Sequence, residues 1–307
     1  ELGLVGSEMC IRDRFYCFTC HSREETPFAI LKAGGILARI VKRVIVPRRE
    51  HMARTWVLLR GLVREKRHWE GFPEQFQAAV PQDTVITLDL PGNGEFWQER
   101  SPTRIAAMVA HAREQLHSQG HSGPYHVVAL SLGAMMAVQW LCQAPHEVAF
   151  AGLINTSASR FSPFWQRLRP MNYRRLLREA VFSRDTLRKE TAILEITSNM
   201  RERDFLHALA EKWAGYAGSQ PVSLSNSLRQ LLAAIRFRAP VALPDSVPVI
   251  IVNGQGDRLV SPSCSRRLAA AWQLPLKVHA EAGHDLPLDA PRWLINTLLE
   301  GVTDSSV

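Results

Sequence analysis

From residue 52 onward, short apolar runs alternate along the chain with longer segments of helical periodicity. The runs have five or six residues and are rich in Val, Ile and Leu, as buried strands are. Segments between them, such as 69–80 and 105–119, have the pattern of helices. Strands that alternate with helices predict an α/β fold with a mainly parallel, doubly wound sheet that helices cover on both faces. We expect its strands at 55–59, 84–89, 125–130, 150–154 and 247–252.

This alternation stops after Thr156. Several amphipathic segments rich in Arg, Leu and Ala follow, and no further strand pattern occurs before Val247. An all-helical insertion between two strands of such a sheet would lie over the carboxyl edge, where open α/β sheets bind their ligands. We therefore expect a core made of residues 52–157 and 244–307, with an all-helical lid at 158–243.

The basic charge of the chain is concentrated in this expected lid. The 307 residues carry a net charge of +8, and residues 158–243 contain 15 Lys and Arg against 7 Asp and Glu. The chain shows no internal repeat and no basic and aromatic pattern of a nucleic-acid-binding module, so we expect no nucleic-acid partner. The net charge is a property of one segment and not of the whole surface.

Apolar content and cysteine number bear on the compartment. The longest apolar candidate for a membrane span, residues 27–46, is interrupted by four Lys and Arg residues, so we expect no span. The five cysteines are an odd number and do not suggest a disulfide framework. The simplest expectation is a reducing, cytoplasmic location.

The first 51 residues have a different character. Residues 4–13 resemble one reading frame of a transposon-end adapter used to prepare sequencing libraries, and residues 14–51 show no clear strand or helix alternation. We expect residues 1–51 to be an extension outside the native fold, with Met52 as the native start.

A C-x-x-C-H pattern lies inside this extension, at Cys17–His21. In c-type haem proteins such a pattern bonds haem through two thiols and ligates iron through the histidine. The match is short, and a zinc site would still need a fourth ligand at the right spacing. We interpret the pattern as a chance occurrence and expect neither a metal nor a cofactor.

The segment Val127–Ala134 carries the strongest chemical signal in the sequence. Ser131 follows an expected strand and precedes an expected helix, with Ala129 and Gly133 two residues to either side. A serine hydroxyl becomes a useful nucleophile on such a sharp strand-to-helix turn, which tolerates only small neighbours. The usual pattern is G-x-S-x-G, so Ala129 is a mild departure. Taken alone, a Ser-x-Gly turn after a strand is more often a purely structural element.

Together with two later loops, this segment resembles the α/β-hydrolase superfamily over residues 52–302. That family orders its triad as nucleophile, acid and histidine. Asp257 lies in the turn after the apolar run that ends at Val252, and His284 follows Gly283 late in the chain. The resemblance implies a triad of Ser131, Asp257 and His284, whereas a loop histidine is the alternative for His284. Asp285 and Asp289 are less favoured as the acid.

The same resemblance implies two backbone donors for an oxyanion. One is the N–H of Leu132, directly after the nucleophile, and the other is the N–H of Leu62 in the loop after the first strand. Arg60 stands where the family commonly has histidine, which is a second departure. The turn at residues 89–94 is similar to the family's D-x-x-G-x-G turn, and it lacks the helix start or the Gly-Lys that a phosphate-binding loop needs.

The resemblance thus implies a serine hydrolase that cleaves a carboxylic ester, or a related acyl bond of a small molecule, through an acyl-enzyme. Acyl transfer and C–C or amide hydrolysis use the same triad and stay open. Two hypotheses come from different classes of protein: a catalytically idle binding protein on this fold, and a haem-bearing electron carrier. Dehalogenases and epoxide hydrolases are disfavoured because they use Asp in the place of Ser131.

An arginine cluster in the expected lid bears on the substrate. It is either a solvated helix face or a site for an anionic partner such as an acyl carrier protein or a coenzyme A ester. With residues 89–92 and 156–159, it gives a narrower resemblance to the esterases that act on pimeloyl-acyl carrier protein methyl ester. We take Arg174 and Arg175 as candidate substrate contacts. The cluster consists of Arg160, Arg167, Arg169, Arg174, Arg175 and Arg178.

Overall fold

The computed structural model of this chain describes residues 53–304 except residue 182. Our expectations for residues 1–51, including the pattern at Cys17–His21, lie outside the described residues. Within the described part, no helix combines the length and the apolar content that crossing a membrane would require.

A six-stranded sheet forms the centre of the described fold. Its strands lie in the order β2-β1-β3-β4-β5-β6, and every pair of neighbours among the described strands is parallel. This arrangement confirms the predicted α/β class. The strands are β1 (Thr55–Leu59), β2 (Thr84–Leu88), β3 (Tyr125–Leu130), β4 (Val148–Ile154), β5 (Val249–Gly254) and β6 (Leu276–His279).

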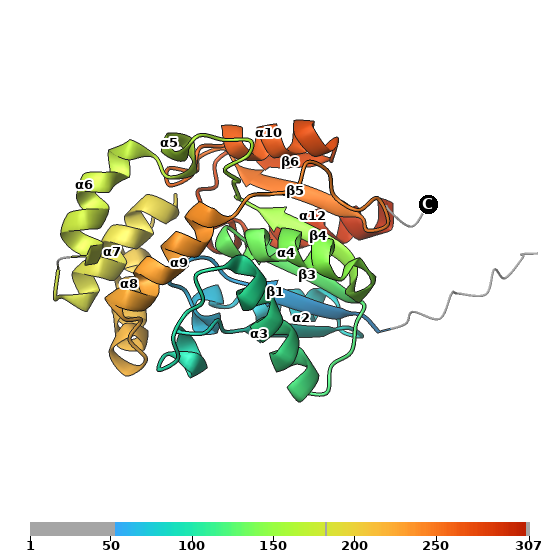
Figure 1. Ribbon diagram of the computed structural model, residues 1–307. Coiled ribbons are helices and arrows are strands. Elements are labelled where there is room, and N and C mark those ends of the chain that lie inside the picture. The colour runs from blue at the N-terminus through green and yellow to red at the C-terminus, as the bar shows by residue number, and fades with distance from the viewer. Residues whose placement is uncertain (1–52, 182, 305–307) are drawn as a thin grey trace, which may run out of the picture. The chain divides into compact units, whose positions relative to one another are not determined.

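Helices cover both faces of the sheet (Figure 1). Side chains of a strand alternate between the two faces, so Val57 and Leu59 join one apolar cluster while Trp56 and Leu58 join the other. This explains why the central strands read as continuous apolar runs. Helices α3 (Ile105–Ser118), α4 (Leu132–Gln143) and α10 (Ser263–Trp272) pack on the first face, and α2 (Phe72–Ala79) and α12 (Pro291–Asp304) pack on the second.

The order of the strands creates a crevice between β1 and β3. From β1 the chain continues to β2, which pairs with one edge of β1. It then returns to β3, which pairs with the other edge of β1 and has Ala129 opposite Leu59. Loops that follow these two strands therefore diverge, and open α/β sheets bind ligands at such a point. The loop that starts at Arg60 and the turn at Ser131 are the ones that border this crevice.

All the elements that the structure describes between β4 and β5 are helical, which agrees with the predicted all-helical insertion. They gather beyond the carboxyl end of β5 (Figure 1) and have a small apolar cluster of their own around Trp213. We refer to residues 158–243 as the lid. Its main helices are α5 (Phe164–Arg167), α6 (Tyr173–Arg175), α7 (Thr186–Thr197), α8 (Arg203–Ser219) and α9 (Leu224–Arg236).

Shorter elements complete the chain. Two lid helices begin at side-chain caps, because Asp185 accepts a hydrogen bond from the N–H of Arg188 and Ser223 accepts one from the N–H of Asn226. The short elements are η1 (Lys66–Trp69), η2 (Gly94–Phe96), η3 (Pro145–Glu147), η4 (Pro170–Asn172), the π-helical turn η5 (Leu176–Val181) and α11 (Leu286–Asp289).

Gly133 gives a test of the packing at this crevice. A Cβ atom on Gly133 would lie 2.3 Å from the carbonyl oxygen of Leu59 and 2.8 Å from that of Arg60, and backbone cannot move aside cheaply. We expect Gly133→Ala to lower the free energy of unfolding by about 1–3 kcal/mol, measured by urea denaturation. Gly215→Ala in α8 is the matched control, since a Cβ there meets nothing within 4 Å. Equal stability of the Gly133 variant and the wild type would contradict this packing.

Candidate active site

Ser131 lies at the turn from β3 into α4 in a backbone conformation that non-glycine residues rarely adopt. Its φ is 58° and its ψ is −109°. Such a conformation costs about 1–3 kcal/mol and persists only where the surroundings fix it. Here the N–H of Ser131 donates to the carbonyl of Ile154 at 2.9 Å, and its own carbonyl accepts from the hydroxyl of Thr156 at 3.0 Å. The turn is therefore held by β4.

The two small neighbours of Ser131 have different reasons to be small. Gly133 lies against the backbone carbonyls at the end of β1, where no side chain fits. Ala129 is fully buried in the apolar cluster on the α4 side of the sheet and pairs with Leu59. A methyl group fits there, so the departure from glycine leaves the turn intact.

Asp257 and His284 are hydrogen-bonded to each other. Asp257 follows β5 and is buried, and its Oδ2 lies 2.7 Å from Nδ1 of His284. Its Oδ1 accepts the backbone N–H groups of Leu259 at 2.8 Å and Val260 at 2.9 Å. Both carboxylate oxygens thus have partners. Because Nδ1 of His284 is bonded to Asp257, Nε2 is the ring nitrogen that can exchange a proton with another group.

Asn155, which was not among the predicted site residues, fixes the histidine loop. Its side-chain amide donates to the carbonyls of Gly283 at 3.0 Å and His284 at 2.8 Å, and its Oδ1 accepts the N–H of Gly254 at 2.8 Å. Asn155 is buried at the end of β4. A polar residue directly after a buried strand, at the ligand-binding edge of the sheet, is a signal that would have found it.

The pKa of His284 is raised above its usual value. Burial of the ring is the largest influence and by itself lowers the pKa, since it disfavours the charged form. The carboxylate of Asp257 raises the pKa through its negative charge and its hydrogen bond, and the charge of Asp285 raises it further. Together these effects outweigh burial. The ring is therefore suited to accept a proton.

Ser131 and His284 line the same cavity, whose volume is about 410 Å³. Gly61 and Leu62 line it as well. A cavity of this size is within the usual range for small-molecule sites. Its walls differ in character. Leucine and isoleucine side chains from the lid form one part, while Arg64, Glu65, His68 and Glu190 form a polar part.

The loop after β1 lies directly against Ser131. A Cβ atom on Gly61 would be 3.4 Å from the Cβ of Ser131, which is van der Waals contact. The N–H of Val63 donates to Oε1 of Gln230 in α9 at 2.8 Å, which ties the loop to the lid. Leu62, between them, lines the cavity. Leu132 is the first residue of α4, and first-turn N–H groups have no partner within their helix.

Arg60 forms a buried ion pair with Asp285, the residue after His284. Its two terminal nitrogens lie 3.0 and 2.7 Å from the two carboxylate oxygens, in a bidentate arrangement. The guanidinium also lies 4.8 Å from the ring centre of Trp69. This explains the departure at Arg60, because the arginine and Asp285 form a complementary pair. The pair connects the loop of Leu62 to the loop of His284.

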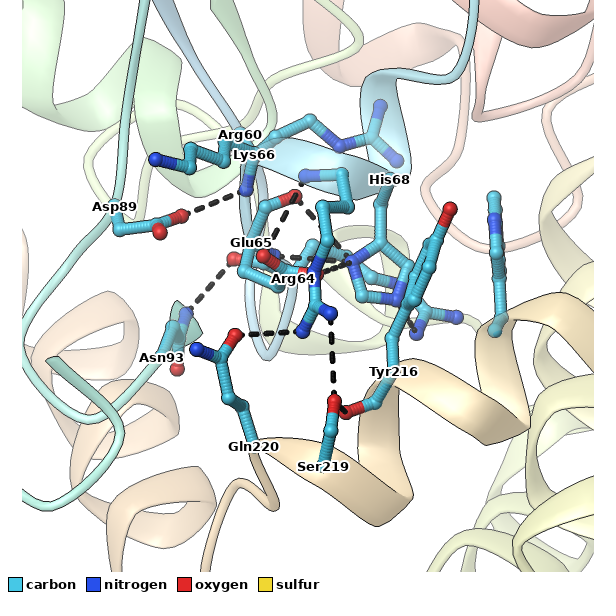
Figure 2. A network of polar contacts seen from close by, with 12 residues as sticks. Arg60, Arg64, Glu65, Lys66, His68, Asp89, Asn93, Tyr216, Ser219 and Gln220 are labelled. Carbon is cyan, nitrogen blue, oxygen red and sulfur yellow. Dashed lines mark hydrogen bonds and ion pairs between the residues drawn. The ribbon is translucent and has the colours of Figure 1, made fainter. Parts of the chain in front are cut away.

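A second polar network joins the loop after β1 to the lid (Figure 2). Arg64 pairs with Glu190 of α7 at 2.7 Å and lies over the ring of Trp213 in α8. Burial, followed by the charges of Arg64 and Arg60, holds the pKa of His68 well below its usual value, so this imidazole is neutral at pH 7. The pKa of Glu65 is raised by burial and then by the nearby Asp89.

Asp89 and Asp289 both have structural partners. Asp89 accepts the N–H groups of Lys66 at 2.7 Å and Glu95 at 3.0 Å, which shapes its turn. Asp289 accepts the N–H of Gly283 and the hydroxyl of Ser198, both at 2.6 Å. Among the described residues, no cluster of three or more His, Cys, Asp or Glu side chains has an arrangement that could hold a metal ion.

Arg174 and Arg175 lie on α6 and are not among the residues that line the cavity of Ser131, although Leu176, the next residue in the chain, lines it. Arg174 is exposed, and Arg175 forms an ion pair with Glu195 of α7. Their role as substrate contacts stays a prediction.

Comparison with known proteins agrees with this fold. The sequence pattern of the alpha/beta hydrolase family matches residues 56–297, so the chain belongs to that family. Over 91 residues it is 30% identical to a Haemophilus influenzae protein with the provisional name 2-succinyl-6-hydroxy-2,4-cyclohexadiene-1-carboxylate synthase. That match spans 30% of this chain and 35% of the relative, about a third of its length.

Solved structures extend the likeness to most of the chain. A provisionally named non-heme bromoperoxidase from Mycobacterium tuberculosis has a TM-score of 0.64 at 20% identity, covering 82% of this chain and 93% of that one. An esterase from a Rhodococcus species has a TM-score of 0.61 at 18% identity, covering 82% and 90%. An esterase from Exiguobacterium antarcticum has a TM-score of 0.61 at 15% identity, covering 82% and 92%. At these identities the likeness shows the fold.

The ion pair of Arg60 and Asp285 makes a double-mutant prediction. Arg60→Met leaves a buried carboxylate without its partner, so we expect the free energy of unfolding to fall by about 3–5 kcal/mol in urea denaturation. Arg60→Met combined with Asp285→Leu removes both charges and should recover most of that loss. Additive losses in the double variant would show that the two side chains are not coupled.

Proposed function

We propose that this protein is a serine hydrolase that cleaves a carboxylic ester, or a related acyl bond of a small molecule, through an acyl-enzyme on Ser131. The observation that carries the proposal is the 2.7 Å bond between Asp257 and His284, at the edge of a cavity that Ser131 also lines. The strained turn at Ser131 supports it, since strain of this kind clusters at functional sites. The two esterases with the same fold are consistent with it.

In the first step, Nε2 of His284 takes the hydroxyl proton of Ser131 while Oγ attacks the carbonyl carbon of the ester. Asp257 holds the proton on Nδ1 and stabilises the imidazolium that forms. The backbone N–H groups of Leu62 and Leu132 are the donors we assign to the oxyanion of the tetrahedral intermediate. His284 then returns the proton to the leaving alcohol, which gives the acyl-enzyme.

In the second step, water takes the place of the alcohol. His284 accepts a proton from the water as its oxygen attacks the acyl carbonyl, and the collapse of the second intermediate restores the hydroxyl of Ser131. An alcohol acceptor in the place of water would make the protein an acyltransferase. The same three residues could also hydrolyse an amide or a C–C bond, and these reactions differ from ester hydrolysis in the products released.

A panel of p-nitrophenyl esters of increasing chain length tests the proposal. We expect wild-type hydrolysis, and we expect Ser131→Ala to lower kcat by about 10⁴–10⁶-fold because the nucleophile is gone. A fluorophosphonate probe should label the wild type and not this variant. Ser225→Ala, an exposed position on α9, serves as the matched control and should retain both properties. A folded wild type that is neither labelled nor active would instead indicate an idle binding protein on the same fold.

The raised pKa of His284 predicts the pH dependence. The histidine must be neutral to accept the serine proton, so kcat/KM should rise with pH through a limb above the ordinary histidine value of about 6.5. Asp257→Asn removes the main influence that raises this pKa. We therefore expect the limb to move to lower pH and kcat to fall by about 10³–10⁴-fold.

Asp245→Asn, at an exposed position, is the control for that experiment and should leave the profile unchanged. A limb at the same pH in Asp257→Asn and in the wild type would mean that another group titrates.

A further inference from the structure

Helix α9 buries two amide side chains against the core and leaves four large apolar side chains exposed. Asn226 and Gln230 are buried. Asn226 accepts the N–H of Ser101 at 3.0 Å, and Gln230 donates to Oδ1 of Asn93 at 2.7 Å besides holding Val63. A surface helix of a globular protein usually buries its apolar stripe instead. The outward stripe of α9 consists of Leu224, Leu228, Leu231 and Ile235, which are 53%, 54%, 36% and 58% exposed.

A neighbouring lid helix adds two large aromatic side chains. Arg167 of α5 donates to the carbonyl of Ala234 in α9 at 2.7 Å, so the two helices are in contact. Phe164 and Trp165 of α5 are 69% and 52% exposed. We call the two aromatic residues and the four residues of the outward stripe the α5–α9 face. Exposed apolar groups in such number on neighbouring helices are typical of an interaction site.

The charged residues of the two segments that carry the α5–α9 face are all arginines. Residues 155–178 contain six Arg and no Asp or Glu, and residues 220–244 contain three Arg and no Asp or Glu. Arg160 and Arg167 donate to backbone carbonyls, which do not neutralise a guanidinium. Arg236 and Arg238 are exposed near the end of the stripe. Arg175 and Arg178 form ion pairs with Glu195 and Glu179, which lie outside these segments, so the positive charge of the face rests on the remaining arginines.

The outward stripe is continuous with the cavity of the candidate active site. Leu224, Leu228 and Leu231 are exposed to solvent and also line the cavity above Ser131, while Ile235 lies one turn beyond the cavity lining. Three of the four α9 residues that line the cavity are leucines and the fourth is Ser227, so a hydrocarbon chain that enters along α9 contacts mainly apolar side chains.

From these observations we propose that the α5–α9 face docks on an anionic lipid surface, and that the site hydrolyses an ester with a long acyl chain drawn from it. The substrate half of this inference rests on the proposed function, whereas the docking does not. Helices that bind at an anionic membrane interface typically combine Leu, Phe and Trp with Arg and have few acidic residues. The negative charge of an acidic protein would be complementary to the arginines. An acidic surface alone would leave the exposed apolar side chains of α5 and α9 uncovered.

The test is co-sedimentation of the full chain with vesicles. We expect binding to vesicles of phosphatidylcholine with phosphatidylglycerol, weaker binding to phosphatidylcholine alone, and release by high salt, because the arginines contribute part of the attraction. Ile235→Glu places a negative charge on the stripe outside the cavity lining. It should weaken binding to the anionic vesicles at least about tenfold. Val278→Glu, on an exposed position of the edge strand β6, should bind as the wild type does.

Activity on two esters separates the docking from the chemistry. With p-nitrophenyl acetate in solution, Ile235→Glu should match the wild type within about twofold, since Ile235 does not line the cavity. With a long-chain ester carried in the anionic vesicles, its rate should fall in step with its binding. If the wild type hydrolysed neither ester, the proposed function would be refuted. The sedimentation result would still decide whether the α5–α9 face binds anionic lipid.

The docking inference is overturned if the wild type does not sediment with anionic vesicles, or if Ile235→Glu sediments as well as Val278→Glu does. A parallel titration with a purified acyl carrier protein addresses the acidic protein partner. The lipid assignment would likewise be overturned if the wild type bound the acyl carrier protein but no vesicles, and if Ile235→Glu abolished that binding. Thermal unfolding of each variant confirms that the substitutions leave the fold unchanged.

Discussion

The parallel pairing of β1 with β3 is the constraint on which the rest of the site depends. It puts Leu59 beside Ala129 and thereby brings the loop of Gly61 against the turn of Ser131. Extension of the sheet through β4 and β5 then places Asn155 and Asp257 at the same edge, where they hold the loop of His284. Residues far apart in sequence meet because parallel strands present their carboxyl ends together.

Much of this could be predicted from sequence, because the information is local. Each central strand is a continuous apolar run, and Ser131 stands between such a run and a helix with small residues at the required spacing. Short or interrupted elements were harder to place. β6 is four residues long and only partly buried, so it has no strong strand pattern and was not predicted. β5 begins at Val249, two residues later than expected, directly after Pro248.

The parts that could not be predicted depend on partners distant in sequence. Arg60 stands where the family commonly has histidine, and its reason is visible only in the structure, where it pairs with Asp285, 225 residues later. The six arginines between residues 160 and 178 form one cluster in sequence, yet Arg160 and Arg167 bond to backbone while Arg175 pairs with a glutamate. The amphipathic pattern of α9 gives the helix but not which side faces the core. That orientation is set by buried amides that find partners in core loops.

Gln230 has a consequence for how the molecule can open. One side-chain amide of the lid holds the backbone of Val63, next to the N–H assigned to anion binding, and also holds the loop of Asn93. If α9 moved away, the loop whose N–H we propose as an oxyanion donor would lose this support at the same time as the cavity widened. On the proposed function, the open state would then be inactive, and the substrate would enter while α9 stays in place.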